Sequence, residues 1–296
     1  MKSIREYLTE FTSKQREAEI ILAHILKTDR ANIIAHPELR LTFFQSLKLS
    51  RAKRALENNI PLAYILGQKE FFGLNFFVNK NVLIPRPETE LIVEEAVKII
   101  SNFQFPMSNQ CQSPNDKITL IDMGTGTGCI PIAIMKTLKH ESVKIIATDI
   151  SRAALRVAKK NAKLHEAKIQ FIKSDLLRKI ISDYSLFLTP YSFVIITANL
   201  PYLTRKWTES EPSIAREPRL ALIADDKNGL SLYEKLFEQI KTLFLLIPFS
   251  LFLLVEIDPR QTTDARNLAK KYFPNAQIEI KKDLAGRDRV LKIELI

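Results

Sequence analysis

The chain has 296 residues, 46% of them apolar, and a formal net charge of +11, which together predict about two domains with packed cores. Its two cysteines, Cys111 and Cys129, and its four scattered histidines show neither a disulfide framework nor a metal-ligand spacing, so we expect no metal and a reducing, cytoplasmic location. The most apolar stretch, residues 243–255, is shorter than the roughly 20 residues that span a bilayer.

The first part of the chain, residues 1–70, has the pattern of a small helical bundle. Apolar side chains recur there at helical spacing, most clearly over residues 56–65. Residues 71–84 alternate as strands do, with a turn at Gly73, and predict a β-hairpin linker. The remaining residues, 85–296, then form the second and larger domain.

The excess of positive charge has two interpretations. The densest group of basic residues in the first domain consists of Lys48, Arg51, Lys53 and Arg54. A basic helix face of this kind suits an acidic protein or a phosphate backbone, but it is equally typical of an ordinary solvated face. We expect no stable nucleic-acid partner and, without a heptad pattern, a monomer.

A glycine-rich turn joins a buried strand to a helix in the second domain. The strand is the apolar run over residues 118–123, and the helix opens at Cys129. The turn consists of Gly124, Thr125, Gly126, Thr127 and Gly128. Glycines at alternate positions let the backbone turn sharply and let a ligand approach without steric clash. The spacing is not the Gly-x-Gly-x-x-Gly of dinucleotide enzymes, so we do not expect a pyrophosphate ligand.

Two further strand ends offer groups to the same ligand. The strand over residues 143–148 ends in Asp149, which is placed to accept hydrogen bonds from two ribose hydroxyls. The strand over residues 169–172 precedes Asp175 and Leu176, which suit the edge and the apolar face of an adenine. The carboxyl ends of parallel strands meet at one edge of a sheet, so the sequence predicts an adenosyl-ligand site there. S-adenosylmethionine is the ligand that fits best.

A fourth strand, residues 193–196, leads into Asn199, Leu200, Pro201 and Tyr202, a tetrapeptide suited to methylating a planar nitrogen. An amide or exocyclic amine is a poor nucleophile because its lone pair is delocalised. The Asn199 side-chain oxygen and the Leu200 carbonyl can each accept one of its N–H groups, and Tyr202 can stack on the planar group. The pattern predicts in-line methyl transfer that depends on positioning and needs no strong base.

The end of the chain completes a sheet. We expect a helix over residues 229–246, a strand ending near Glu256, a helix over 261–272, and a closing strand pair over 278–281 and 290–296. The whole order predicts an α/β fold, in which a seven-stranded, Rossmann-like sheet ends in a reversed edge hairpin and follows an N-terminal helical bundle.

These motifs, together with residues 61–67, 71–74, 82–90 and 282–289, resemble the release factor glutamine methyltransferases, the HemK/PrmC family, over nearly the whole chain. The resemblance implies a class I methyltransferase domain, S-adenosylmethionine as donor and S-adenosylhomocysteine as product. It also implies that the helical domain recognises class I peptide chain release factors. The acceptor is then the side-chain amide of the Gln in their Gly-Gly-Gln motif, with Asn199 also near the methionyl end of the donor.

One residue departs from the family pattern. Leu200 stands where the family usually has proline, and Asn-Leu-Pro-Tyr is typical of ribosomal RNA adenine dimethylases. Leu200 keeps the required carbonyl, and Pro201 still restricts it to an extended conformation. The alternative function is that of an RNA adenine exocyclic-amine methyltransferase. Residues 82–90 and the Phe-Phe-Gly hairpin argue against it, because adenine dimethylases are not expected to carry these segments. A non-catalytic S-adenosylmethionine-binding protein is a third reading, and the reaction motif speaks against it.

Overall fold

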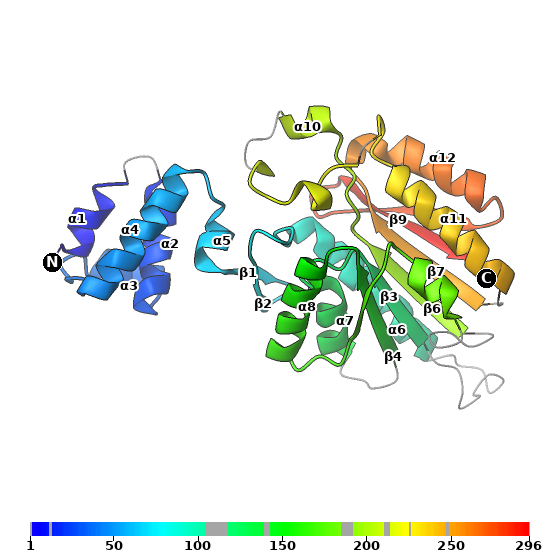
Figure 1. The fold of residues 1–296 in the computed structure, drawn as a ribbon, viewed down its shortest axis with the longest axis horizontal. Coiled ribbons are helices and arrows are strands. Elements are labelled where there is room, and N and C mark those ends of the chain that lie inside the picture. Colours follow the sequence, from blue (N-terminus) through cyan, green and yellow to red (C-terminus); the bar gives the residue numbers. More distant parts are fainter. Residues whose placement is uncertain are drawn as a thin grey trace. The chain divides into compact units, whose positions relative to one another are not determined.

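The computed structural model describes residues 2–11, 14–104, 118–138, 143–184, 192–209, 214–224, 226–246 and 249–295. The chain separates into two compact units, Met1–Gln68 and Lys69–Ile296, and each has a hydrophobic core of its own (Figure 1).

The described part of the first unit is helical, as expected. Its helices are α1 (Ile4–Leu8), α2 (Gln15–Leu26), α3 (Arg30–Ala35), α4 (Phe43–Glu57) and α5 (Leu62–Leu66). Helices α1 and α4 each begin with a capping box, in which Ser3 or Thr42 exchanges hydrogen bonds with the residue three positions later. Ile21, Leu22 and Leu49 are almost completely buried between the helices. The amphipathic pattern in the sequence therefore closes a core within this unit.

A short hairpin follows, formed by β1 (Gln68–Phe71) and β2 (Leu74–Phe77). Phe72 and Gly73 have φ values of 51° and 70°, the left-handed conformation that two-residue hairpin turns require. The strands lie earlier than the range expected from the sequence, because residues 78–84 form no strand. Within that range the Asn79 side chain accepts a backbone N–H two residues on, at 2.9 Å, and this favours a local turn over strand pairing.

The second unit contains the predicted seven-stranded sheet. Its strands are β3 (Ile118–Met123), β4 (Val143–Asp149), β5 (Gln170–Lys173), β6 (Ser192–Ala198), β7 (Phe249–Glu256), β8 (Gln277–Lys282) and β9 (Asp288–Leu295). They lie in the order β5-β4-β3-β6-β7-β9-β8, parallel from β5 to β7, with β9 antiparallel to both of its neighbours. The chain reverses its direction of winding between β3 and β6, the place where ligands bind in such sheets.

Helices cover both faces of the sheet (Figure 1). On one face lie α6 (Glu90–Gln104), α7 (Cys129–Leu138) and α8 (Arg152–Leu164), and on the other α11 (Ser231–Leu246) and α12 (Thr262–Tyr272). Neighbouring strand residues alternate between the two cores: Leu120 packs with the first set of helices and Ile121 with the second. Strand β3 is buried at every position for this reason.

Shorter elements surround the edge where the parallel strands end. They are η1 (Pro87–Thr89), α9 (Arg178–Ser182), α10 (Arg205–Glu209), η4 (Arg219–Ala221) and η5 (Pro259–Gln261), of which the three η elements are 3₁₀ turns. Among the described residues no helix is long and apolar enough to cross a membrane, and no three potential metal-ligating side chains are grouped together. Cys129 is a buried free thiol, while Cys111 lies outside the described residues.

Candidate active site

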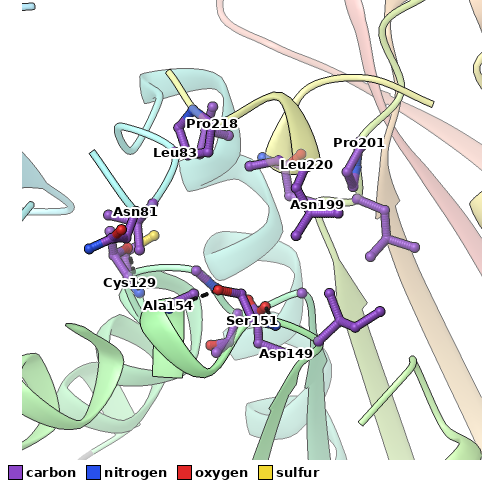
Figure 2. Close-up of a pocket in the computed structure, with 18 of the residues that line it drawn as sticks. Asn81, Leu83, Cys129, Asp149, Ser151, Ala154, Asn199, Pro201, Pro218 and Leu220 are labelled. Atoms are coloured by element: carbon purple, nitrogen blue, oxygen red, sulfur yellow. Dashed lines mark hydrogen bonds between the residues drawn. The ribbon is translucent and has the colours of Figure 1, made fainter. Parts of the chain in front are cut away.

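A cavity of about 310 Å³ lies at the carboxyl ends of β3, β4 and β6 (Figure 2). Most of the predicted site residues line it, namely Gly124, Thr125, Gly126, Thr127, Asp149, Asp175, Leu176, Asn199, Leu200 and Pro201. Figure 2 shows Asp149 and Ser151 on one side, Leu83 with Pro218 on another, and Asn199 with Leu220 and Pro201 on a third. Gly128 and Tyr202 are the two predicted residues that do not line this cavity.

The glycines of the turn have different tasks. Gly124, Gly126 and Gly128 all have positive φ, at 64°, 53° and 78°, which only glycine adopts at little cost. A Cβ on Gly124 would also lie 3.0 Å from the Leu200 side chain, on the cavity wall. A Cβ on Gly128 would instead meet Ile132 and Ala158 at 3.2 and 3.3 Å, so this glycine lets α7 and α8 approach each other.

Asp149 links the end of β4 to the glycine turn. Its Oδ2 accepts the backbone N–H of Gly126 at 3.0 Å, and its Oδ1 accepts that of Ser151 at 2.7 Å. Burial raises the pKa of Asp149, whereas these two N–H groups act in the opposite direction. Each carboxylate oxygen retains a second acceptor position, so the side chain can still bind a pair of hydroxyls in the cavity.

Asp175 and Leu176 lie at the end of β5 and reach the same cavity. Asp175 Oδ2 pairs with Lys235 Nζ at 2.5 Å, which leaves its other oxygen for a ligand. Leu176 has a φ of 51°, a strained conformation for a residue with a side chain. The next residue anchors the backbone there, because the Leu177 N–H donates to the Gln239 side chain at 2.7 Å.

Asp122, one residue before the end of β3, is a candidate that the sequence analysis did not select. Its Oδ1 accepts the Thr197 hydroxyl at 2.7 Å, but its Oδ2 and the Thr125 hydroxyl are buried without a hydrogen-bond partner among the described residues. Buried polar atoms of this kind are rare. Thr125 lines the first cavity, whereas Asp122 lies behind the glycine turn and lines neither cavity. The acid at the strand end was visible in the sequence, whereas its complete burial was not.

The charge state of Asp122 makes a prediction for stability. Burial raises its pKa from 3.8 to about 7. Between these pH values the unfolded carboxyl ionises while the native one keeps its proton, so the free energy of unfolding falls by about 1.4 kcal/mol per pH unit as pH rises. Asp122→Asn, which keeps an acceptor for Thr197, should show a correspondingly shallower slope in urea unfolding over about pH 5–7. Parallel slopes for the two proteins would contradict this assignment.

The predicted reaction tetrapeptide follows β6. The Asn199 amide donates through Nδ2 to the Thr89 hydroxyl at 3.0 Å, and its Oδ1 has no hydrogen-bond partner among the described residues. The Leu200 carbonyl likewise takes no hydrogen bond in that part of the chain, while the Leu200 N–H donates to the Tyr233 hydroxyl at 3.3 Å. Two acceptors are therefore available side by side along the chain.

A second cavity, of about 330 Å³, also has Asn199 and Leu200 in its wall. Tyr202 and Trp207 line it as well, and the Arg260 guanidinium lies 3.8 Å from the centre of the Trp207 ring. The Tyr202 hydroxyl donates to a Glu256 carboxylate oxygen at 2.9 Å, which holds the ring at the cavity wall. Asn199 and Leu200 thus border two cavities, the arrangement that a donor and an acceptor would need.

The backbone at Tyr202 is held from a second side. Its carbonyl accepts the Gln261 side-chain amide at 3.0 Å. A Cβ on Gly229 would lie only 2.0 Å from that carbonyl oxygen, so the close approach requires glycine. Gln261 and Gly229 come from segments far along the sequence, and for that reason the sequence analysis did not find them.

Residues 82–90 form part of the wall of the first cavity, through Val82, Leu83, Pro85, Arg86 and Thr89. The Glu217 carboxylate fastens this segment to the loop after α10: it accepts the Ile84 backbone N–H at 3.0 Å and pairs with the Arg86 guanidinium. Glu217 is buried, so its charge is balanced by these contacts. The segment before α6 is therefore fixed in place as part of the cavity wall.

Leu200→Pro introduces the proline that the resembled family usually has at this position. Proline lacks the N–H that contacts Tyr233, a loss of about 0.5–1.5 kcal/mol in the free energy of unfolding. It keeps the carbonyl at position 200, so a methyl transfer that uses this carbonyl as an acceptor should persist within a few-fold of the original rate. Urea unfolding and a methyl-transfer assay measure the two effects. A loss of kcat of more than about tenfold in a folded variant would show that the Leu200 side chain or N–H takes part in the reaction.

Family models match two parts of the chain: residues 1–67 match "PrmC N-terminal domain" and residues 108–195 match "Methyltransferase small domain". The release factor glutamine methyltransferase of Flavobacterium psychrophilum is 34% identical, with 98% of each chain covered. That of Bacillus anthracis is 30% identical over 100% of this chain and 98% of its own. Among solved structures, the catalytic domain of hMettl16 in complex with a 3'UTR hairpin is 14% identical with a TM-score of 0.52, covering 86% of this chain and 83% of that one.

The hMettl16 likeness supports the fold alone, because the sequence identity is low. The two relatives match across essentially their full length, including both cavities and the first unit. They support methylation of a protein glutamine and do not support the RNA adenine alternative. The chain belongs to the release factor glutamine methyltransferase family.

Proposed function

We propose that this protein transfers the methyl group of S-adenosylmethionine to the side-chain amide nitrogen of the Gln in the Gly-Gly-Gln motif of class I peptide chain release factors. The observation that carries the proposal is the position of Asn199 and Leu200 between two cavities, with the Asn199 Oδ1 and the Leu200 carbonyl both unoccupied by intramolecular hydrogen bonds in the described structure.

The first cavity fits the donor. Its volume lies within the range of small-molecule sites, and it combines a carboxylate from Asp149 with apolar side chains such as Leu176 and Leu220. Asp149 would hold the ribose hydroxyls, Leu176 the adenine face, and the glycine turn the methionyl part. When bound, the donor supplies an electrophilic methyl group on a sulfonium.

The second cavity suits the acceptor side chain. A primary amide offers two N–H groups, and the Asn199 Oδ1 and Leu200 carbonyl can accept one each. These bonds orient the nitrogen and strengthen as it becomes positive during transfer, which is when electrostatic stabilisation lowers the barrier. Tyr202 lines the same cavity and would stack on the planar amide. The proton of the product nitrogen can pass to water, so a strong base in the site is not required.

The release factor is also expected to contact the first unit, which we propose as a substrate-recognition domain. Its basic group of Lys48, Arg51, Lys53 and Arg54 lies along α4. The acceptor loop enters the cavity, and a separate unit can hold the body of the protein substrate away from the chemistry. The reaction would take place in the cytoplasm, where translation terminates.

A parallel labelling experiment tests the substrate class. Purified protein and methyl-labelled S-adenosylmethionine are incubated with a class I release factor in one series and with ribosomal RNA in another. The proposal predicts label on the release factor and background label on RNA. Label on RNA alone would overturn the proposal and would support the RNA adenine methyltransferase alternative.

A further inference from the structure

The Asn199 amide is connected to a buried carboxylate through one hydroxyl group. Asn199 Nδ2 lies 3.0 Å from Thr89 Oγ1, and Thr89 Oγ1 lies 2.6 Å from Glu256 Oε2. Thr89 is 2% exposed and Glu256 is 1% exposed, so water does not compete for these contacts. Thr89 precedes α6, Glu256 ends β7 and Asn199 follows β6, so three separate elements meet at this point.

The number of hydrogens fixes the direction of each bond. A threonine hydroxyl has one hydrogen, and an ionised carboxylate can only accept. Thr89 must therefore donate to Glu256, and it can only accept from Asn199. The Asn199 amide consequently presents its NH₂ group to Thr89 and its Oδ1 away from it. The flipped amide would set two acceptors, Oδ1 and the Thr89 oxygen, against each other.

We propose that Glu256, acting through Thr89, is the positioning residue that sets the orientation of the Asn199 amide and so presents Oδ1 to the acceptor nitrogen. This inference rests on the proposed function, in which Oδ1 accepts a substrate N–H. Residues 87–90 then take part in the reaction site, because Thr89 connects Glu256 to Asn199.

The same carboxylate also holds Tyr202. The Tyr202 hydroxyl donates to Glu256 Oε1 at 2.9 Å, so the two oxygens of one side chain are shared between the two reaction residues. Burial and the Glu256 charge raise the pKa of the Tyr202 hydroxyl, which keeps its proton and remains a donor. The Tyr233 hydroxyl donates to the Glu256 backbone carbonyl and fixes the end of β7.

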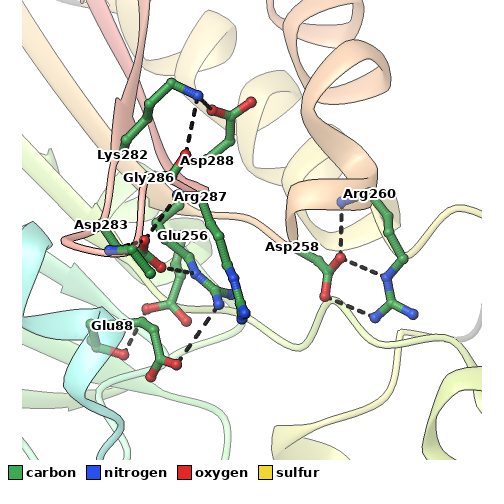
Figure 3. A network of polar contacts seen from close by, with 12 residues as sticks. Glu88, Glu256, Asp258, Arg260, Lys282, Asp283, Gly286, Arg287 and Asp288 are labelled. Atoms are coloured by element: carbon green, nitrogen blue, oxygen red, sulfur yellow. Dashed lines mark hydrogen bonds and ion pairs between the residues drawn. The ribbon is translucent and has the colours of Figure 1, made fainter.

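The positive charge of Arg289 acts on the Glu256 carboxylate. Arg289 lies in the segment 282–289 that the sequence analysis singled out, and its guanidinium pairs with Asp283 at 2.9 Å and with Glu88 at 3.7 Å (Figure 3). Figure 3 shows Glu256, Glu88 and Asp283 at this end of the sheet, and the charges of Glu88 and Arg289 both act on Glu256. Burial raises the pKa of the Glu256 carboxyl, whereas the hydrogen bonds from Thr89 and Tyr202 and the Arg289 charge act in the opposite direction.

Protonation of Glu256 would remove this constraint. A protonated Glu256 can donate to Thr89, which frees the threonine hydrogen, so the Asn199 amide is no longer held in one orientation. The charged and titratable groups that face Glu256 are Tyr202, Tyr233, Arg289 and Glu88. Activity should therefore fall as pH drops through the pKa of Glu256.

The test compares Thr89→Val, which has no hydroxyl, with Thr89→Ser, which keeps it. At saturating donor and release factor, Thr89→Val should lower kcat about tenfold or more, as the loss of one orienting hydrogen bond does, while Thr89→Ser stays within about threefold of the original protein. The dissociation constant of the donor should stay within about twofold in both variants. Equal kcat values for the valine variant and the original protein, or equal damage in both variants, would overturn the proposal.

Two measurements separate positioning from a general packing role. Hydrogen exchange of the Asn199 side-chain NH₂, followed by NMR, should be slow in the original protein and in Thr89→Ser, and fast in Thr89→Val. Adding Thr89→Val to Glu256→Leu, which has no acceptor for the Thr89 hydrogen, should lower kcat no further than Glu256→Leu alone, because the two residues act in one chain. Fast exchange in the original protein, or additive losses, would contradict the relay.

The exchange measurement needs no substrate, so it tests the relay even if the proposed function fails. If the original protein labels only RNA, the proposed function is wrong, and slow exchange lost in Thr89→Val would still support the relay. If the release factor is labelled and the exchange is fast in every variant, the function stands and the relay is wrong.

Discussion

Asn199→Ala is expected to lower kcat for release-factor methylation at least about a hundredfold, as the loss of one preorganised polar contact at the reacting group does. The substitution removes the Oδ1 acceptor and also the group that contacts Thr89. Asn199 also lines the donor cavity, but donor affinity should fall much less than kcat, because the glycine turn and Asp149 remain in place. Steady-state kinetics with saturating donor, together with calorimetry of donor binding, measure both quantities.

The chain offers a matched control for this variant. Asn267 lies on an exposed position of α12, so Asn267→Ala makes the same chemical change away from the cavities. Its kcat should be unchanged. If Asn199→Ala keeps kcat within about threefold of the original protein, well under 1.4 kcal/mol in barrier height, the amide-orienting role of Asn199 is wrong.

Asp149→Ala should weaken donor binding at least about a hundredfold, since hydrogen bonds to a charged group are worth about 1.5–3 kcal/mol each and two are expected to the ribose. The variant also frees the N–H groups of Gly126 and Ser151, which the carboxylate accepts at 3.0 and 2.7 Å. The loss therefore combines a missing ligand contact with a looser turn. Isothermal titration calorimetry with S-adenosylmethionine measures the dissociation constant directly.

Asp264→Ala is the control for that experiment, because Asp264 is exposed at the start of α12. It should leave the affinity unchanged. Circular dichroism of both variants checks that the sheet has formed. An affinity of Asp149→Ala within about threefold of the original would exclude Asp149 from the donor site.

The sequence was sufficient for the elements that carry a strong local pattern. Strand β3 and the glycine turn are an apolar run followed by alternate glycines, and the order of helices and strands then determines the sheet. Asp149 and Asn199 were found because each directly follows a strand, and the ends of parallel strands meet at one edge. Their contacts with the cavities follow from topology alone.

The residues that hold Asn199 and Tyr202 in place could not be predicted from the sequence in the same way. Thr89 contacts Glu256, and Gly229 approaches Tyr202, only when distant segments fold, and each of these residues has an ordinary local explanation in the sequence. Gly128 shows the opposite case, since its place in the glycine motif indicated a ligand contact while the structure places it between two helices. Leu200 was expected to act through its carbonyl, and the contact of its N–H with Tyr233 depends on a helix more than thirty residues later.

We expect the methyl group on one glutamine nitrogen of a release factor. Fragmentation mass spectrometry of a release factor treated with the purified protein and S-adenosylmethionine locates the added methyl group. We predict a single methyl on the side chain of the Gln in the Gly-Gly-Gln motif, and none after treatment with Asn199→Ala over the same period. A methyl group on another residue, or on ribosomal RNA in place of the release factor, would contradict this prediction.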